Sequence, residues 1–453
     1  MIEVRCFHTL EEAESLREQI NALNLASARP DPFSTFEFYE NYLRNEEHFP
    51  RWEDLRPWFL VAFAAGQLVG YLPLKQVAHK VMGLRVPQLD WLTAHTADRP
   101  HMVVRPEYAN KVSEAFYAYL LKRKQEWSFL EFQQQDGTSP LFPLPAAVDF
   151  KDYRVRHWPN MENGTIPVCW STLDEYFKAF SKKFRSNVSR QMRTLFSAGE
   201  VEFLVSSDPA TTPHLFELYR TIEPRSWKSG ADAAIGRHPK WVEYYKGLLG
   251  ARQPMQVSIH VLLLDGVPIA GLINGSFEKG LYALHIVYDH RLSRLAPGAA
   301  VLLMGMRHAI NGRYAFFDLL WGFGYYKTRW LAEMTETRSV QIYRVGRIFF
   351  WQRMLGDLKR RMLTRGAKGE PVLFNPASRD VSERQTIAGS ASIPEMTAEE
   401  KRRVAVLVAR VRQGQGEFLS SAALASVMPF ETERVTRRLE SSGERGSRLN
   451  TLH

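Results

Sequence analysis

Residues 280–330 decide the fold, with the sequence GLYALHIVYDHRLSRLAPGAAVLLMGMRHAINGRYAFFDLLWGFGYYKTRW. The apolar run at residues 281–287 predicts a buried strand, and residues 314–320 predict a second one. Between them, a Pro-Gly-Ala-Ala turn opens an apolar helix that ends near residue 311, since proline suits the first helical turn. The first amides of a helix have no partners within it and stabilise a bound phosphate. The stretch therefore predicts two strands and a helix arranged around a phosphate-bearing ligand.

The same order of elements occurs twice along the chain. Residues 58–75, WFLVAFAAGQLVGYLPLK, and residues 257–275, VSIHVLLLDGVPIAGLING, are both typical of a β-hairpin with a small turn. In the second hairpin, Asp265 and Gly266 tolerate the positive φ angles of a tight turn. Each hairpin follows a helical region and precedes further strands and a helix. We therefore expect an α/β fold with mixed sheets, of the α+β type, built from two tandem copies of one unit.

The repeat and the local composition divide the chain. We expect a first domain over residues 1–155 and a second over residues 160–350, with a boundary in the polar stretch around residues 156–163. Residues 351–392 hold an aromatic-basic helix and a linker of low hydrophobicity. Residues 393–453 predict a small helical tail that resembles a helix-turn-helix. We expect this tail to dock as a small bundle or to bind a partner protein, with DNA as the less favoured partner.

Composition bounds the class of protein. The chain has 453 residues, 45% of them hydrophobic, which is enough to bury the cores of several domains. Cys6 and Cys169 show neither metal-ligand nor redox spacing, so we expect no metal, a reducing compartment and a cytoplasmic location. No apolar run approaches the roughly 18 residues of a membrane span. The net charge of +10 fits a solvated basic surface, and it would also attract nucleic acid, an anionic membrane or an acidic substrate.

Several motifs resemble the GNAT acyltransferase superfamily, in particular its branch of cellulose-biosynthesis-associated acetyltransferases, which is related to the Fem-type aminoacyltransferases. Their order and approximate spacing agree over residues 165–335, while the first half is similar mainly through Asp31-Pro32-Phe33. The matching residues are Lys183-Phe184-Arg185, Ser226-Trp227-Lys228-Ser229-Gly230, Asp265-Gly266, Pro268-Ile269-Ala270, Tyr288-Asp289, Pro297-Gly298, Phe317-Asp318, Gly322, Tyr326-Lys327 and Trp330.

This resemblance implies tandem GNAT-like domains, a degenerate first copy, and an acyltransferase whose co-substrate is acyl-coenzyme A, expected to be acetyl-coenzyme A. It also implies that the first strand of the opening stretch supplies a backbone amide to the thioester carbonyl. The chain departs from the family pattern just before the helix, where Leu295 replaces the usual Gln or Arg and Arg294 lies one place early. The residues implied to bind the pyrophosphate are Pro297, Gly298, Ala299 and Ala300.

Acyl transfer needs a base for the acceptor, a polarised carbonyl and an acid for the leaving thiolate. Tyr326 could protonate the thiolate, and Tyr325 is an equal candidate by chemistry. Glu223 or Asp289 could act as the base, because burial can raise the pKa of a carboxylate, although a helix cap or ion pair suits either one. His285 could face the cleft, or it could be a satisfied core histidine.

Lys228 and Lys327 each lie close in sequence to a tryptophan, Trp227 and Trp330. A lysine beside an indole can bind carboxylate or phosphate while its stem packs on the ring. We therefore expect both lysines to orient an anionic substrate or cofactor, with plain surface charge as the alternative. The predicted catalytic residues are Tyr326, Lys327, Lys228 and Glu223, and the predicted substrate-binding residues are Trp227, Asp289 and Trp330.

Three functions stay open on the sequence. The leading one is transfer of an acyl group from acyl-coenzyme A to an amine or hydroxyl of a small molecule, lipid or saccharide. The second is Fem-type transfer from aminoacyl-tRNA, for which a basic helix with Lys182, Lys183, Arg185, Arg190 and Arg193 offers a phosphate-binding face or simply a solvated one. The third is a noncatalytic GNAT-like scaffold that regulates exopolysaccharide production.

Overall fold

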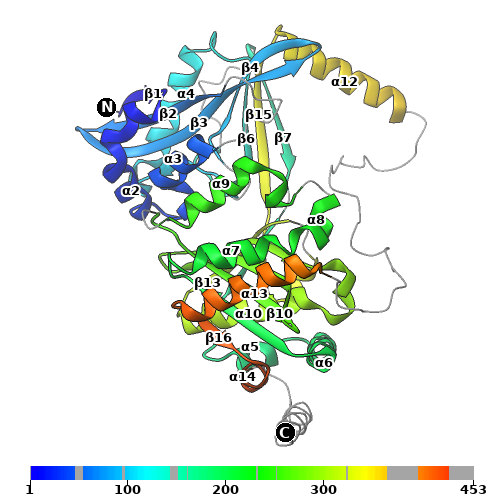
Figure 1. Cartoon of the computed structure of the whole chain (residues 1–453). Helices are drawn as coiled ribbons and strands as arrows, with labels where there is room; N and C mark the ends of the chain where they lie inside the picture. The colour runs from blue at the N-terminus through cyan, green and yellow to red at the C-terminus, as the bar shows by residue number, and fades with distance from the viewer. Residues whose placement is uncertain are drawn as a thin grey trace, which may run out of the picture. The chain divides into compact units, whose positions relative to one another are not determined.

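The computed structural model describes residues 2–45, 55–93, 97–142, 151–160, 162–230, 233–250, 253–322, 325–364 and 396–427. The chain forms two compact units, each with its own sheet (Figure 1). Unit 1 contains Met1–Glu40, His48–Met161 and Glu336–Gly389, and unit 2 contains Asn41–Glu47, Glu162–Thr335 and Ser390–His453. The predicted mixed α/β class is confirmed, because each sheet has antiparallel pairs and one parallel pair among these residues.

The sheet of unit 1 has the order β1-β2-β3-β4-β6-β15-β7, and β5 pairs with β3. Its core is rich in aromatic side chains because Trp58, Trp91 and Trp127 lie on or beside the strands and are almost fully buried. The strands are β1 Ile2–Phe7, β2 Arg56–Ala64, β3 Gln67–Val81, β4 Leu84–Trp91, β5 Val103–Val104, β6 Phe129–Asp136, β7 Tyr153–Pro159 and β15 Thr337–Arg344. The helices that begin in this unit are α1 Leu10–Ala13, α2 Arg17–Leu25, α3 Phe36–Asn45, α4 Ala109–Lys122 and α12 Ile348–Thr364.

The sheet of unit 2 has the order β14-β8-β13-β12-β11-β10-β9-β16. Its strands are β8 Asn163–Pro167, β9 Val201–Ser206, β10 Gln256–Leu264, β11 Val267–Phe277, β12 Gly280–Tyr288, β13 Phe316–Trp321, β14 Glu333–Thr335 and β16 Glu417–Leu419. Its helices are α5 Leu173–Lys178, α6 Lys182–Ala198, α7 Thr212–Arg220, α8 Trp227–Gly230, α9 Pro239–Leu248, α10 Pro297–Asn311, α11 Tyr325–Arg329, α13 Ala398–Gln413 and α14 Ser421–Val427.

Helices α7 and α10 cover opposite faces of the unit 2 sheet. A Cβ at Gly271 would touch the ring of Tyr219 on α7, whereas Leu272, the next residue of β11, contacts Gly305 on α10. Successive side chains of a strand point to opposite faces, so the two helices lie on the two sides. The apolar strand at residues 281–287 is therefore buried between helical layers, as its sequence predicts.

Both predicted hairpins form, with the predicted turns. β10 and β11 pair in antiparallel register around Asp265 and Gly266, whose φ angles are 49° and 73°. β2 and β3 pair likewise around Ala65 and Gly66, with φ angles of 49° and 81°. Two consecutive positive φ angles define the turn whose twist matches that of the flanking strands.

The structure differs from the predicted division of the chain at two places. The second domain was expected to run to residue 350, but β15 pairs with β6 and β7 in the sheet of unit 1. The tail was expected to be helical and to dock as a small bundle; α13 does pack on α7, but the tail also contains a strand, β16, which pairs with β9. Both segments complete a sheet that was begun more than 180 residues earlier, and such long-range pairing has no local sequence signal.

Two other expectations concern single segments. The stretch that holds the predicted basic helix, residues 173–198, forms two helices, α5 and α6, because Ser181 caps the second by accepting from the amide of Phe184. The linker after residue 364 and the second helix of the helix-turn-helix, at residues 431–441, lie outside the described residues. Among the helices that the structure describes, none is both long and apolar enough to cross a membrane.

Candidate functional site

The parallel strands β12 and β13 separate halfway along their length. They pair at three positions, Gly280 with Phe316, Leu281 with Phe317 and Tyr282 with Asp318. Beyond Tyr282, β12 continues for six residues without pairing to β13. We call this divergence the β12–β13 opening. It leaves one edge of β12 with amide and carbonyl groups that are not used by the sheet, as at any unpaired strand edge.

A bulge in β12 lies at the start of this opening. Ile273 of β11 is opposite His285, and Asn274 is opposite Ala283, so Leu284 is an extra residue in β12. A bulge bends a strand and re-aims its neighbouring groups. Beyond it, His285 is held on both sides: Nδ1 lies 2.6 Å from the hydroxyl of Tyr219, and Nε2 lies 3.4 Å from the carbonyl oxygen of Ala233. The structure thus places His285 as a satisfied histidine.

Helix α10 begins beside this strand, where the sequence predicts phosphate binding. Ala296 adopts a left-handed conformation, with φ and ψ of 49°, and turns the chain into Pro297. Gly298 and Ala299 are partly exposed, whereas Pro297 and Ala300 are buried. A Cβ at residue 298 would lie 3.0 Å from the ring of Tyr288, the last residue of β12. Glycine thus allows this ring to approach the start of α10 closely, and any larger residue would push the ring away.

The segment before α10 explains the departures from the family pattern. Leu295, which occupies the place of a Gln or Arg, is buried, so its side chain packs in the core. Arg294, one place earlier, is exposed at the end of the short helix His290–Leu295. A guanidinium is thus available one residue away from the expected position, and with the amide of Gly298 it suits an anionic group, whereas the amide of Ala299 already donates to the carbonyl of Ala296.

Glu223 and Lys228 form a buried charged pair next to β12. Glu223 is 1% exposed, and its two carboxylate oxygens accept from the amides of Ile235, at 2.7 Å, and Gly236, at 2.8 Å. Burial raises the pKa of Glu223, and these hydrogen bonds and the charge of Lys228 oppose the rise. Burial lowers the pKa of Lys228 from 10.5 to about 7, against the attraction of Glu223. Lys228 is therefore an amine that is partly neutral near physiological pH.

The segment that carries Lys228 is connected to the opening. The carbonyl of Lys228 accepts from the amide of Ala233, and the carbonyl of Ala233 is the group that faces His285 on β12. Trp227 is 46% exposed, and the Nζ atom of Lys228 lies 5.9 Å from the centroid of its ring. The predicted Trp-Lys pairing is thus present at residues 227 and 228, with an indole face available for an acceptor.

Tyr326 and Lys327 have different surroundings although they are adjacent in α11. Tyr326 is 49% exposed, and loss of water around its hydroxyl, with a contribution from Tyr288, raises its pKa to about 12. Lys327 is 1% exposed, and its Nζ donates to the carbonyl oxygen of Leu320. Leu320 lies near the end of β13 and has a positive φ of 54°, so the backbone is distorted there. The hydrogen bond from the ammonium of Lys327 stabilises this end of the strand. The structure places Tyr326 beside Tyr288 and the α10 entry, and Lys327 in the core.

The remaining predicted substrate-binding residues, Asp289 and Trp330, are buried among protein groups. Asp289 is fully buried and accepts from the guanidinium of Arg291, at 2.8 and 3.0 Å, with Arg225 at 3.2 Å. It also caps the helix that follows it, by accepting from the amide of Arg291. Trp330 is 5% exposed and packs edge-on against Phe180 and Phe184 of the basic helix region. Both side chains shape the unit, and the described contacts leave neither turned toward solvent.

Sequence reasoning assigned no role to two site residues, Tyr219, which it did not name, and Tyr288, which it named only in the Tyr288-Asp289 match. Tyr219 is fully buried, its hydroxyl contacts His285, and burial and Glu223 raise its pKa far above the ordinary value. Tyr288 covers Gly298 and contributes to the pKa of Tyr326. The spacing of Tyr219 and Glu223, four residues apart, is a signal that could have linked the first of them to the site.

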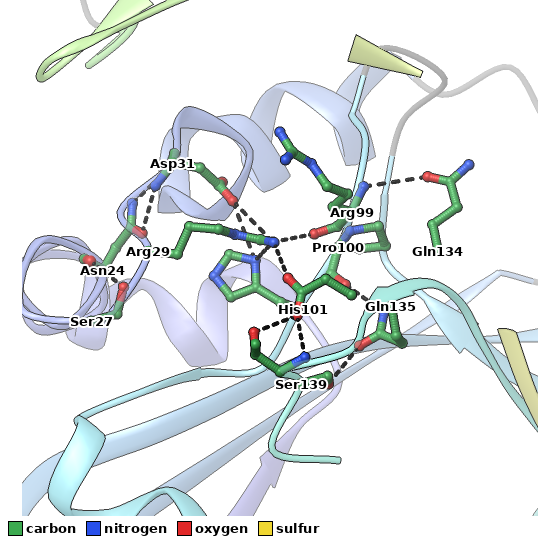
Figure 2. Close-up of polar contacts among 12 residues, drawn as sticks. Asn24, Ser27, Arg29, Asp31, Arg99, Pro100, His101, Gln134, Gln135 and Ser139 are labelled. Atoms are coloured by element: carbon green, nitrogen blue, oxygen red, sulfur yellow. Dashed lines mark hydrogen bonds and ion pairs between the residues drawn. The ribbon is translucent and has the colours of Figure 1, made fainter. Parts of the chain in front are cut away.

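Unit 1 has its polar groups in a different arrangement at the comparable place (Figure 2). Its parallel strands β4 and β6 pair only at Gln88 with Phe129 and Leu89 with Leu130. Figure 2 shows that the loop after β4 is fastened to β6 by side chains, with Gln135 donating to the carbonyl of Pro100 at 2.6 Å. The loop also meets Arg29, which donates to Asp136 at 2.7 Å and to the carbonyl of Arg99.

The centre of this cluster is a buried histidine–carboxylate pair. Nδ1 of His101 lies 3.2 Å from Asp31, the residue of the Asp-Pro-Phe resemblance (Figure 2). Burial lowers the pKa of His101 and raises that of Asp31, while Arg29 favours the ionised Asp31. The helix that follows begins with Pro106-Glu107-Tyr108 in place of small residues. The carboxylate of Glu107 at the start of this helix repels a phosphate. This arrangement fits a unit that does not bind acyl-coenzyme A.

Comparisons with known proteins bear on the family of this chain. Residues 182–328 match the family model described as the acetyltransferase (GNAT) domain. No curated protein sequence matches the chain. Among solved structures, FemX is 13% identical, with a TM-score of 0.51 over 79% of this chain and 99% of its own.

Two further solved structures are similar at lower scores. The C-terminal domain of a putative lysylphosphatidylglycerol synthetase from Agrobacterium fabrum is 12% identical, with a TM-score of 0.45 over 80% of this chain and 99% of its own. A tandem GNAT protein from the clavulanic acid biosynthesis pathway is 11% identical, with a TM-score of 0.44 over 77% and 99%. The strand-helix-strand unit around the β12–β13 opening lies inside the matched residues, so this region is similar to the acetyltransferase (GNAT) domain, and the chain shares its fold with FemX.

Proposed function

We propose that unit 2 transfers an acyl group from acyl-coenzyme A, with acetyl-coenzyme A as the expected donor, to an amine or hydroxyl of a small molecule, lipid or saccharide. The observation that carries the proposal is the β12–β13 opening beside the glycine entry of α10, within the residues that match the GNAT domain. A strand edge with unused amides lies next to a helix end that favours negative charge. This arrangement suits a thioester with a pyrophosphate attached.

The donor would be held mainly by main-chain groups. The amide of Gly298, in the first turn of α10, would donate to the pyrophosphate, and the exposed Arg294 would add a charge-assisted contact. An amide of β12 beyond the Leu284 bulge would polarise the thioester carbonyl, because an amide fixed by the sheet needs no reorganisation as negative charge develops. Bound there, the co-substrate supplies the activated carbonyl.

We assign the base to Lys228. With a pKa of about 7, its amine is neutral in about half of the molecules near pH 7, and it can take the proton of an acceptor amine or hydroxyl. Glu223 would act as a positioning residue, because its oxygens already accept from Ile235 and Gly236 and its charge favours the protonated lysine. The exposed ring of Trp227 would bind the apolar face of the acceptor.

Tyr326 would give its proton to the departing sulfur. The bond from the acceptor nitrogen or oxygen to the acyl carbon forms while the bond from that carbon to sulfur breaks. The acceptor proton goes to Lys228 and the tyrosine proton goes to the thiolate, after which solvent restores both groups. Because the pKa of Tyr326 is about 12, the tyrosine is protonated at neutral pH, and its hydroxyl can donate to the sulfur as the carbon–sulfur bond breaks.

The test combines binding and turnover. Titration calorimetry of the full chain with acetyl-coenzyme A should give binding that the Gly298→Glu variant loses, because bulk and negative charge at the α10 entry repel the pyrophosphate. A panel of labelled thioesters incubated with the protein and cell extract, analysed by mass spectrometry, then identifies the acceptor. If the protein does not bind coenzyme and transfer requires aminoacyl-tRNA, the Fem-type reaction replaces this proposal. If neither coenzyme binding nor transfer is found, the protein is a noncatalytic scaffold.

A further inference from the structure

The segment that carries Lys228 is fastened to the end of β12 at two points. Before the lysine, the guanidinium of Arg225 lies 3.2 Å from the carboxylate of Asp289, the residue that follows β12. After the lysine, the carbonyl oxygen of Ala233 lies 3.4 Å from Nε2 of His285. Because these contacts lie on both sides of Lys228 in sequence, the lysine is held beside the part of β12 beyond the bulge, which does not pair with β13.

The side chain of Lys228 is buried, but its amine is not fixed by an acceptor. The residue is 9% exposed, and Nζ lies 5.9 Å from the centroid of the Trp227 ring. Both oxygens of Glu223 accept from the amides of Ile235 and Gly236. Among the residues that the structure describes, no oxygen accepts a hydrogen bond from Nζ. Burial of an ammonium without an acceptor is unfavourable, so the pKa of Lys228 falls to about 7 and the neutral amine is well populated.

A neutral lysine amine is a nucleophile toward thioesters. Lysines that are desolvated in apolar surroundings are the ones that enzymes use to form covalent intermediates with carbonyl carbons. The donor proposed for unit 2 places its acyl carbonyl on the amide edge of β12, beside Lys228. When an acceptor is bound, the amine takes the proton of the acceptor. When the site holds donor alone, the same nitrogen can attack the carbonyl carbon.

We propose that Lys228 is a self-acylation site, whose amine takes the acyl group of the bound donor when no acceptor is present. The bond from Nζ to the acyl carbon forms while the carbon–sulfur bond breaks, and the electron pair of that bond goes to sulfur. One proton of the amine passes to the sulfur, through Tyr326 or solvent. The products are an ε-N-acyl-lysine and the free thiol. The inference rests on the proposed function of unit 2, because that function supplies the thioester.

The modification would regulate the site in which it forms. Acylation replaces an amine that is partly charged by a neutral amide, so the modified side chain is better suited to its buried position. An amide nitrogen does not take a proton at neutral pH, so unit 2 loses its base and transfer stops. A bound acceptor competes for the acyl group. Self-acylation would therefore switch off those molecules that hold donor while acceptor is scarce.

The experiment follows the label from deuterated acetyl-coenzyme A. Full-length protein is incubated with it at neutral pH without acceptor, and each lysine is assayed by mass spectrometry of peptides. Lys228 should be labelled at least roughly tenfold faster than Lys183, an exposed lysine of α6, because its amine is neutral and close to the donor. Lys327 is the matched buried control and should stay unlabelled, because its Nζ donates to a carbonyl in the core. In the Gly298→Glu variant, Lys228 should be labelled no faster than Lys183.

Calorimetry with acetyl-coenzyme A on the same samples separates this inference from the proposed function. If coenzyme binds but Lys228 is labelled no faster than Lys183, self-acylation is wrong and the donor site stands. If Lys228 is labelled equally fast in Gly298→Glu and in the parent protein, the acyl group does not come from the bound donor, and the inference is wrong as well. If the protein neither binds coenzyme nor becomes labelled, both proposals fail.

Discussion

Replacement of Lys228 by methionine should stabilise unit 2 at neutral and acidic pH and lose this advantage as the pH rises. The pKa of Lys228 falls from 10.5 to about 7 on folding, because burial disfavours its charge more than Glu223 favours it. Between these values the unfolded state binds more protons, so the free energy of unfolding of the parent protein rises with pH. Below pH 7 the cost of the buried ammonium is fully present, and methionine has no such cost.

The size of the effect follows from the pKa shift. Because the pKa falls from 10.5 to about 7 and each tenfold change in proton affinity is worth about 1.36 kcal/mol, the buried ammonium costs roughly 4–5 kcal/mol. The free energy of unfolding of Lys228→Met minus that of the parent protein should therefore fall by about 3 kcal/mol between about pH 6.5 and about pH 9.5. Loss of the Lys228 charge also removes one of the groups that lower the pKa of Glu223, whereas the hydrogen bonds from Ile235 and Gly236 remain.

In the assay, the protein is unfolded in urea at a series of pH values. The fraction of molecules with unit 2 unfolded is measured by a pulse of hydrogen exchange, at one fixed pulse pH, in peptides of β11, a buried strand of this unit. Lys183→Met, at an exposed position of α6, is the matched control and should change the free energy of unfolding by less than about 0.5 kcal/mol at every pH. If the two proteins differ in free energy of unfolding by the same amount at every pH, the buried ammonium does not have the predicted cost. The variant should also lose most turnover, with coenzyme affinity retained.

Three further predictions concern other residues of the site. Gly298→Ala should weaken coenzyme binding measured by calorimetry, because its Cβ would lie 3.0 Å from the ring of Tyr288, and affinity equal to that of the parent would exclude this contact. Tyr326→Phe should lower kcat about 100-fold or more with little change in KM, whereas an equal loss in Tyr325→Phe alone would move the acid to that tyrosine. Lys327→Ala should lower the free energy of unfolding of unit 2 by about 1–3 kcal/mol in urea, because the carbonyl of Leu320 loses its buried donor. A variant that is as stable as the parent protein but inactive would instead support a catalytic role for Lys327.

Features with a local physical cause could be predicted from the sequence. The turns at Asp265-Gly266 and the start of α10 at Pro297 follow from backbone preferences of the residues themselves, and both are confirmed. Alternation and apolar runs predicted the strands β10 to β13 within a few residues. The exposed Trp227 next to the buried Lys228 also fits the expected Trp-Lys pairing.

Features that depend on distant partners could not be predicted. Lys327, like Lys228, lies close in sequence to a tryptophan, but its ammonium donates to the carbonyl of Leu320, a residue with a left-handed conformation, in the core. Asp289 is an acidic residue after a strand, and only the fold brings Arg225 to it. The placement of β15 in the sheet of unit 1 depends on pairing with β6, about 200 residues earlier in the chain. No local sequence pattern shows which sheet β15 joins.

Hydrogen exchange of the full-length protein with and without acetyl-coenzyme A tests most directly whether the β12–β13 opening and the α10 entry bind the donor. Protection should appear in peptides that contain residues 283–288 and residues 298–300, and the Gly298→Glu variant should show none. Binding detected by calorimetry with protection elsewhere, and with both of these segments unchanged, would contradict the account.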